Sequence, residues 1–214
     1  QMGNAYRLKS DLTTALDNYF IASKIAIDQN LIEEQGSIKT AIADVYSIMG
    51  DSKNAVSFYR KSIAMLGKLV KIHEESKDSV ALESVSLGLA SAELNLGDEY
   101  FNQKKLDSAL HYFNESGKVF KALKYEVGEA YNLGNVGLVY AEKGENEKAE
   151  ENLNEAIRVL TKLEDFYPIC VYLNAMSDVY SDKKLHKKAL AYATRSLNLA
   201  EKYGLKDQIS DGYL

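Results

Sequence analysis

The 214-residue sequence is poor in the residues that usually build disulfide-bonded or metal-binding domains. Its one cysteine, Cys170, cannot form an internal disulfide, and its one proline, Pro168, suits a chain made largely of helices. The three histidines, His73, His111 and His186, have no cysteine, histidine or glutamate at metal-ligand spacing. We therefore expect no metal ion and no cofactor.

Catalytic motifs and membrane-spanning runs are lacking as well. The sequence has no glycine-rich phosphate loop, no nucleophile elbow and no paired-carboxylate motif, so we do not expect an enzyme. No apolar run is long enough to cross a bilayer and no signal peptide is apparent, which leaves both the bacterial cytoplasm and the periplasm open. The net charge is −5 without a basic periodic face, which argues against nucleic acid as a partner.

A pattern of small and large residues recurs along the whole chain. Within residues 133–157, Gly137 is followed by Tyr140 and then by Ala149, Leu153 and Ala156. The small residues suit the closest approach of two antiparallel helices, and the large ones fill the space beside it. The recurring tyrosines are Tyr6, Tyr46, Tyr100, Tyr140 and Tyr180, and the alanines nine residues after them are Ala15, Ala55, Ala109, Ala149 and Ala189.

This spacing resembles that of the tetratricopeptide repeat, a helical hairpin of about 34 residues. The resemblance covers residues 1–214 as a single array and implies an all-α, right-handed superhelix of about five helical hairpins. The first and last hairpins are incomplete in the sequence, so we expect a fragment truncated at both ends. The expected repeat units are 1–29, 30–77, 78–124, 125–166 and 167–205, with 206–214 starting a further one.

One repeat interval is longer than the others. Successive tyrosines lie 40, 54, 40 and 40 residues apart, so one interval holds 14 extra residues, about four helical turns. An equal split between two helices keeps an antiparallel pair in register, and it predicts long helices over about 53–76 and from Asp78 or Ser79 onward. Asn30 with Glu33 resembles a capping box and predicts a helix start at Asn30.

The resemblance also implies a function, a non-catalytic scaffold that binds a protein or peptide along its concave face. That face is lined by the first helix of each repeat, where acids outnumber the single arginine, so the predicted ligand is an extended or helical segment carrying Lys or Arg. For any single aspartate, a solvated surface charge is the alternative. The predicted partner-binding residues are Asn4, Arg7, Asp44, Asn95, Asp98, Phe101, Asn135, Glu142, Asn174, Asp178 and Asp182.

The context of the chain has two interpretations. Long repeats with short acidic or lysine-containing turns resemble the arrays attached to histidine kinases or adenylate/guanylate cyclases in bacterial signalling proteins, which favours a sensory or regulatory segment. The alternative is a self-association module that brings its parent protein together as a homodimer.

Overall fold

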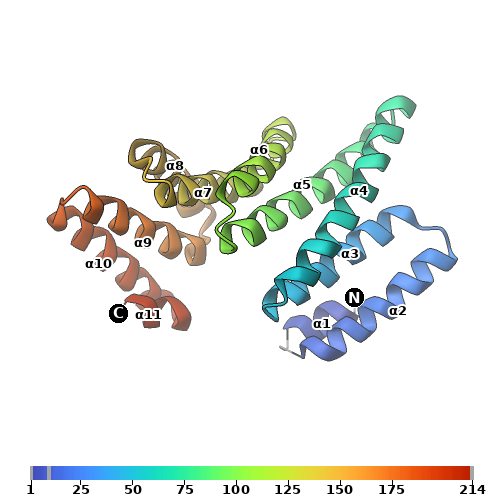
Figure 1. The fold of residues 1–214 in the computed structure, drawn as a ribbon, viewed down its shortest axis with the longest axis horizontal. Helices are drawn as coiled ribbons and strands as arrows, with labels where there is room; N and C mark the ends of the chain where they lie inside the picture. Colours follow the sequence, from blue (N-terminus) through green and yellow to red (C-terminus); the bar gives the residue numbers. More distant parts are fainter. Residues whose placement is uncertain (1, 9–10, 213–214) are drawn as a thin grey trace. The chain divides into compact units, whose positions relative to one another are not determined.

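The computed structural model of the protein describes residues 2–8 and 11–212, and these residues form eleven α-helices and no β-strand (Figure 1). The all-α fold class expected from the sequence is thereby confirmed. Residues 1 and 9–10 of the first expected repeat unit, and 213–214 of the last, lie outside the described residues. The helices are α1 (Met2–Leu8), α2 (Leu12–Asp28), α3 (Ile32–Ile48), α4 (Ser52–Ser76), α5 (Ser79–Asn102), α6 (Leu106–Ala122), α7 (Glu126–Glu142), α8 (Asn146–Leu163), α9 (Phe166–Asp182), α10 (His186–Tyr203) and α11 (Lys206–Gly212).

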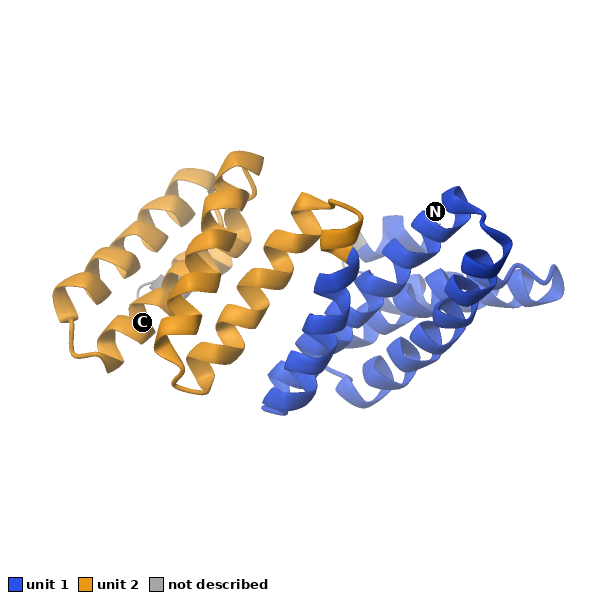
Figure 2. Cartoon of the chain, turned by 90° about the horizontal axis from the view of Figure 1, so that it is seen from above, with its two compact units in different colours: residues 1–119 blue, residues 120–214 orange. Residues whose placement is uncertain are grey.

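The chain divides into two compact units, Gln1–Val119 and Phe120–Leu214 (Figure 2). In unit 1, α1 packs with α2 and α3 packs with α4, and α5 packs with both α3 and α4. In unit 2, α7 packs with α8 and α9 with α10, while α11 begins a further pair against α10. The first helices of neighbouring hairpins also touch, α3 with α5 in unit 1 and α7 with α9 in unit 2. Each unit therefore carries its own row of first helices.

The repeated glycine lies where two helices cross. A Cβ atom added to Gly137 of α7 would lie 2.7 Å from Cγ of Leu153 in α8, and one added to Gly97 of α5 would lie 2.4 Å from the ring of Phe113 in α6. Side chains at these sites would overlap their neighbours, since real Cβ contacts are longer. Ala149, the repeated alanine of this hairpin, is fully buried. The motif therefore marks the closest approach of each pair, as the sequence predicts.

The two long helices have the lengths expected from an equal split. α4 has 25 residues and α5 has 24, whereas α3, α6 and α7 have 17 each. The excess of seven or eight residues corresponds to about 10 Å of helix at 1.5 Å per residue. The turn between them is short: Lys77 adopts a left-handed conformation, and the carboxylate of Asp78 accepts a hydrogen bond from the Ala81 N–H, 3.1 Å away.

One helix start differs from the sequence prediction. α3 begins at Ile32 rather than Asn30, and its N-cap residue, Leu31, makes no side-chain cap. Asn30 instead has a φ of 54° and forms the left-handed turn residue, a role that asparagine tolerates better than most residues. α9 begins at Phe166, two residues before Pro168, so the proline still lies in the first turn, where its missing N–H leaves no helical hydrogen bond unmade.

Aromatic pairs that the sequence analysis did not single out link the two helices of several hairpins. In three hairpins the repeated tyrosine stacks on the ring twelve residues later, with ring centroids 5.2–5.7 Å apart. Such stacking adds to the hydrophobic contact and fixes the helices against each other. The stacked pairs are Tyr46 with Phe58, Tyr100 with Tyr112, and Tyr180 with Tyr192.

Candidate functional site

The predicted partner-binding residues lie on the first helices of the hairpins in both units. Those in unit 1 come from α1, α3 and α5, and those in unit 2 from α7 and α9. We call the two sets the unit 1 face and the unit 2 face. The unit 1 face is Asn4, Arg7, Asp44, Asn95, Asp98 and Phe101, and the unit 2 face is Asn135, Glu142, Asn174, Asp178 and Asp182.

Asp44 of α3 is the centre of the unit 1 face. Its Oδ1 accepts a hydrogen bond from the Tyr59 hydroxyl at 2.7 Å and another from Asn95 Nδ2 at 3.0 Å. Its Oδ2 accepts from Nη1 of Arg7 at 3.4 Å, so the carboxylate is also ion-paired. Side chains from α1, α3, α4 and α5 thus meet at one carboxylate, which joins three hairpins of the unit.

Burial dominates the electrostatics of Asp44. Desolvation raises the pKa of this carboxyl above its ordinary value, although the Tyr59 hydroxyl, the Arg7 guanidinium and the Asn95 amide each lower it. The pKa of the Tyr59 phenol is raised too, mainly by burial and by the neighbouring Asp44 charge. Tyr59 therefore stays protonated, and its hydroxyl donates a hydrogen bond to Asp44. The Asp44 carboxylate is already engaged within the protein.

Tyr59 and Tyr19 were not predicted from the sequence to take part in this face. Both are buried, but their hydroxyl groups reach the first helix fifteen residues earlier in the chain. The Tyr19 hydroxyl donates to Oδ1 of Asn4, as the Tyr59 hydroxyl donates to Asp44. A polar residue followed by tyrosine at this spacing, in two successive repeats, is the sequence signal that could have revealed the pairs.

The remaining unit 1 residues are less exposed than expected for a solvated surface. Asp98 and Phe101 of α5 are both half-buried, and the Lys104 ammonium lies 5.6 Å from the centre of the Phe101 ring. Asn95, one of the predicted partner-binding residues, directs its amide to Asp44. Its role in ligand binding stays a prediction.

The unit 2 face is organised around an aromatic side chain rather than an ion pair. A Cβ atom on Gly134 of α7 would lie 2.0 Å from Cζ of Tyr172 in α9, so only glycine leaves room for this buried ring. The Tyr172 hydroxyl lies 3.3 Å from Oδ1 of Asn135 and 3.4 Å from the Tyr131 carbonyl oxygen, between which it shares its proton. Asn135 is thus held beside the aromatic contact between the two helices.

Three carboxylates occupy the other end of the unit 2 face. The pKa of Asp178 is raised, first by partial burial and then by the negative charges of Asp182 and Glu142. Asp178 and Asp182 follow Asn174 at four-residue steps along α9, so the three share one side of the helix. Within the described part of the chain, Asn174, Asp178 and Asp182 form no hydrogen bond or salt bridge through their side chains. The carboxylates of Asp178 and Asp182 are therefore not engaged by other side chains of the described residues.

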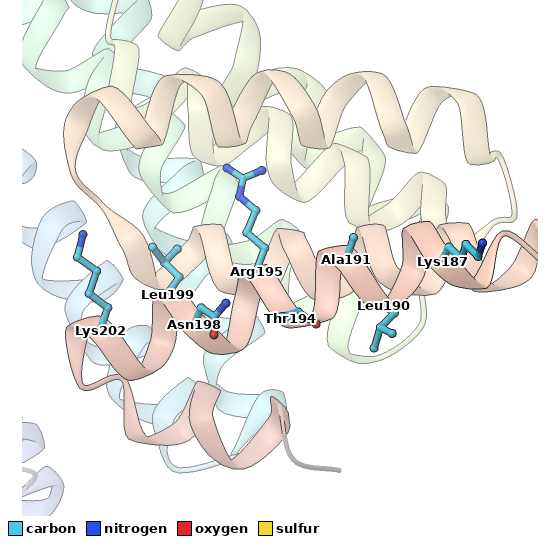
Figure 3. Close-up of a pocket in the computed structure, with 8 residues that line it drawn as sticks. All are labelled: Lys187, Leu190, Ala191, Thr194, Arg195, Asn198, Leu199 and Lys202. Carbon is cyan, nitrogen blue, oxygen red and sulfur yellow. The ribbon is translucent and has the colours of Figure 1, made fainter.

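A depression of about 680 Å³ follows the solvent-facing side of α10 in unit 2 (Figure 3). All eight of its lining residues come from that one helix, including Lys187, Arg195 and Lys202. It is an open helix surface without converging polar groups from other elements. Among the described residues, no group of three or more His, Cys, Asp or Glu side chains is placed to hold a metal ion, and none of the described helices is long and apolar enough to cross a membrane.

Sequence comparison decides the family. Residues 88–162 and 126–202 match a sequence model described as the tetratricopeptide repeat, and residues 37–65 match a second model of the same description. Together these segments cover more than half of the chain. The chain belongs to the tetratricopeptide-repeat family. The resemblance inferred from its small and aromatic residues is thereby confirmed. The sequence matches no curated protein at a significant level.

Several solved tetratricopeptide-like structures share the fold. The apo form of RapI has a TM-score of 0.81 and 18% identity over 99% of this chain and 72% of that one. Aspartyl phosphate phosphatase F from Bacillus subtilis has a TM-score of 0.77 and 14% identity over 97% of this chain and 52% of that one. The Rap conjugation gene regulator of plasmid pLS20, in complex with the Phr* peptide, has a TM-score of 0.71 and 17% identity over 98% of this chain and 54% of that one. At these identities the likeness shows the fold alone.

Proposed function

We propose that this tetratricopeptide-repeat chain is a non-catalytic scaffold that binds an extended or helical peptide segment along its first helices. The observation that carries the proposal is the grouping of Asp178, Asp182 and Glu142 at one end of the unit 2 face, where partial burial and then the two neighbouring charges raise the pKa of Asp178. A lysine or arginine of a ligand placed among these carboxylates would relieve their mutual repulsion. The predicted ligand is therefore a peptide with at least one basic residue.

The two faces have different parts in this proposal. At the unit 1 face, a ligand would have to compete with Arg7, Tyr59 and Asn95 for the Asp44 carboxylate. At the unit 2 face, Asp178 and Asp182 have no such competing partner among the described residues. We therefore assign recognition of the basic residue to the unit 2 face. The peptide complex formed by the plasmid regulator of the same fold supports a peptide as the ligand class.

A selection from random peptides tests this proposal. A synthetic library with equal numbers of basic and acidic residues is passed over the immobilised 214-residue protein, and the bound peptides should be enriched in Lys and Arg. For a selected peptide, Asp178→Lys with Asp182→Lys should raise the dissociation constant about tenfold or more, because attraction becomes repulsion. The effect should weaken with added salt.

A matched control carries the same change in charge at the same spacing. Glu147 and Glu151 of α8 also lie four residues apart and are exposed, and Glu147 forms a 3.7 Å ion pair with Lys183. Glu147→Lys with Glu151→Lys loses this ion pair but leaves Asp178 and Asp182 in place, so it should leave peptide affinity nearly unchanged. Equal loss of affinity in both double variants would show a general charge effect. Retained affinity and retained Lys/Arg enrichment in the Asp178/Asp182 variant would contradict the proposed site.

The kind of parent protein is proposed from the long repeats and their short acidic or lysine-containing turns. We propose that the chain is the sensory or regulatory segment of a larger bacterial signalling protein, with a histidine kinase or an adenylate/guanylate cyclase as its output. Reading the parent gene on both sides of the 214 residues tests this directly. A gene without a kinase or cyclase domain would contradict it.

A further inference from the structure

The solvent-facing side of α2 differs from that of every other second helix described in the chain. The repeat register places the compared positions five and six residues after the buried alanine of each hairpin. In α2 these positions hold Phe20 and Ile21. In α4, α6, α8 and α10 they hold polar residues, namely Arg60 and Lys61, Asn114 and Glu115, Asn154 and Glu155, and Thr194 and Arg195.

The apolar side chains of α2 are open to solvent. Ile21 is 61% exposed, Ile25 50% and Ile27 57%, and Phe20 remains 43% exposed although its ring edge touches Phe58 of α4. α2 packs against α1 and α3, which cover its opposite side, including Ala15 and Tyr19. Clustered apolar surface that no part of the described chain covers marks a contact with another surface.

Two of the three charged residues of α2 have opposite signs and lie on either side of Phe20 and Ile21, and the third, Asp28, ends the helix. Asp17 precedes Phe20 by three residues, and Lys24 follows Ile21 by three. The two charged residues are seven apart, about two helical turns, so they lie on the same side of the helix. Both are exposed, and neither has a hydrogen-bond or salt-bridge partner elsewhere in residues 2–8 and 11–212.

This arrangement is complementary to itself. If a second α2 lies antiparallel to the first, with the two-fold axis between Phe20 and Ile21, Asp17 of each copy faces Lys24 of the other. Phe20 and Ile21 of both copies then meet at the centre, flanked by two identical ion pairs, while Ile25 and Ile27 lie outside the ion pairs. A contact of this type is isologous and closes as a dimer without further copies. An apolar partner of another kind could also cover Ile21, but a second copy necessarily carries both charges at the complementary spacing.

We propose that two copies of the chain associate through the solvent-facing sides of their α2 helices. This interface lies on a second helix of unit 1, whereas the proposed peptide site lies on the first helices of unit 2. Peptide binding and dimerisation can therefore be tested separately. Dimerisation would bring two copies of a parent protein together, whatever its output.

Sedimentation equilibrium of the 214-residue chain at micromolar concentrations tests the interface. The wild-type protein should have twice the monomer mass, and Ile21→Asp should shift it to the monomer while preserving the helical circular-dichroism spectrum. Asp17→Lys alone and Lys24→Asp alone should each weaken the dimer on the order of tenfold or more, because like charges then face each other. Asp17→Lys combined with Lys24→Asp should restore the dimer, because it recreates both ion pairs with reversed signs.

The control is Thr194→Asp, which changes the position of α10 equivalent to Phe20 and should leave the dimer intact. A monomeric wild-type chain would overturn the proposal and assign the apolar surface to a different partner or to another part of the parent protein. A dimer that survives Ile21→Asp would place the contact elsewhere and overturn it as well. So would a charge-reversed double variant that stays folded and monomeric.

Discussion

The two first-helix faces hold aspartates at the same position of the repeat and use them differently. In unit 1, Asp44 accepts hydrogen bonds from Tyr59, Asn95 and Arg7 and so joins three hairpins. In unit 2, Asp178 has acidic neighbours, and its pKa is raised partly by their charge. The side chains that surround a carboxylate, rather than its position in the repeat, decide whether it stabilises the fold or remains available to a ligand.

The physical reason lies in the residue fifteen positions later, on the second helix. In unit 1 this residue is Tyr59, which is long enough to bring a hydroxyl from the core to Asp44. The equivalent residue for Asp178 is Ala193, which has no polar atom in its side chain. A single change at a core position therefore alters the charge that the repeat presents on its first helix.

The largest expected effect concerns the packing that supports the unit 2 face. Gly134→Ala should destabilise the protein toward the upper end of about 1–3 kcal/mol, because the new methyl group overlaps the buried Tyr172 ring. Gly67 of α4 is the matched control, since a Cβ atom there meets nothing within 4 Å. Gly67→Ala should stabilise the helix by up to about 1 kcal/mol. Urea denaturation of both variants measures the difference, and equal stabilities would contradict the tight contact at Tyr172.

An intermediate effect distinguishes the two aspartates directly. Asp44→Ala should cost about 1–2 kcal/mol of unfolding free energy, because Tyr59 and Asn95 lose their acceptor and Arg7 its counter-charge. Asp178→Ala should change stability by no more than about 0.5 kcal/mol, because no hydrogen bond is lost. Chemical denaturation monitored by circular dichroism gives both values. Equal costs would remove the distinction between the structural and the available carboxylate.

The smallest expected effect is in the titration of the same two groups. Both pKa values are raised above the ordinary aspartate value, so protonation favours the folded state of each. The corresponding stability is present below the unfolded-state pKa and is lost as pH rises through the folded-state pKa. The unfolding free energy of the Asp178→Asn variant, relative to that of the wild-type protein, should therefore increase as pH rises from acid to neutral.

Substitutions that remove a neighbouring charge should separate the causes of the pKa shifts of Asp44 and Asp178. Arg7→Met should raise the pKa of Asp44 further, because a positive charge is lost, while Asp182→Asn should lower the pKa of Asp178, because a negative charge is lost. Carboxyl carbon NMR titrations of the two variants measure both changes. A shift in the opposite direction at either site would show that its charged neighbour was assigned wrongly.

Much of the fold follows from the sequence because the repeat motif is local. Gly137 and Ala149 identify a helix crossing within a single hairpin, and the tyrosine spacing, together with the register of an antiparallel pair, predicted the equal lengthening of α4 and α5. The predicted start of α3 was wrong because asparagine suits both a helix cap and a left-handed turn. In the structure Asn30 takes the left-handed turn that ends α2. The repeat boundaries and the partner-binding residues stay predictions.

By itself, the sequence determined the helical hairpins, their register and the family, since each depends on residues fewer than about 40 positions apart. Only the tertiary structure decided which aspartate is engaged, because Asp44 and Asn95 lie 51 residues apart and meet through the stacking of α3 on α5. It also decided that the apolar residues of α2 remain exposed, since α1 and α3 pack on the other side of the helix. The energy of a charge or an apolar side chain depends on what lies next to it in space, and spacing along the chain specifies this only within one hairpin.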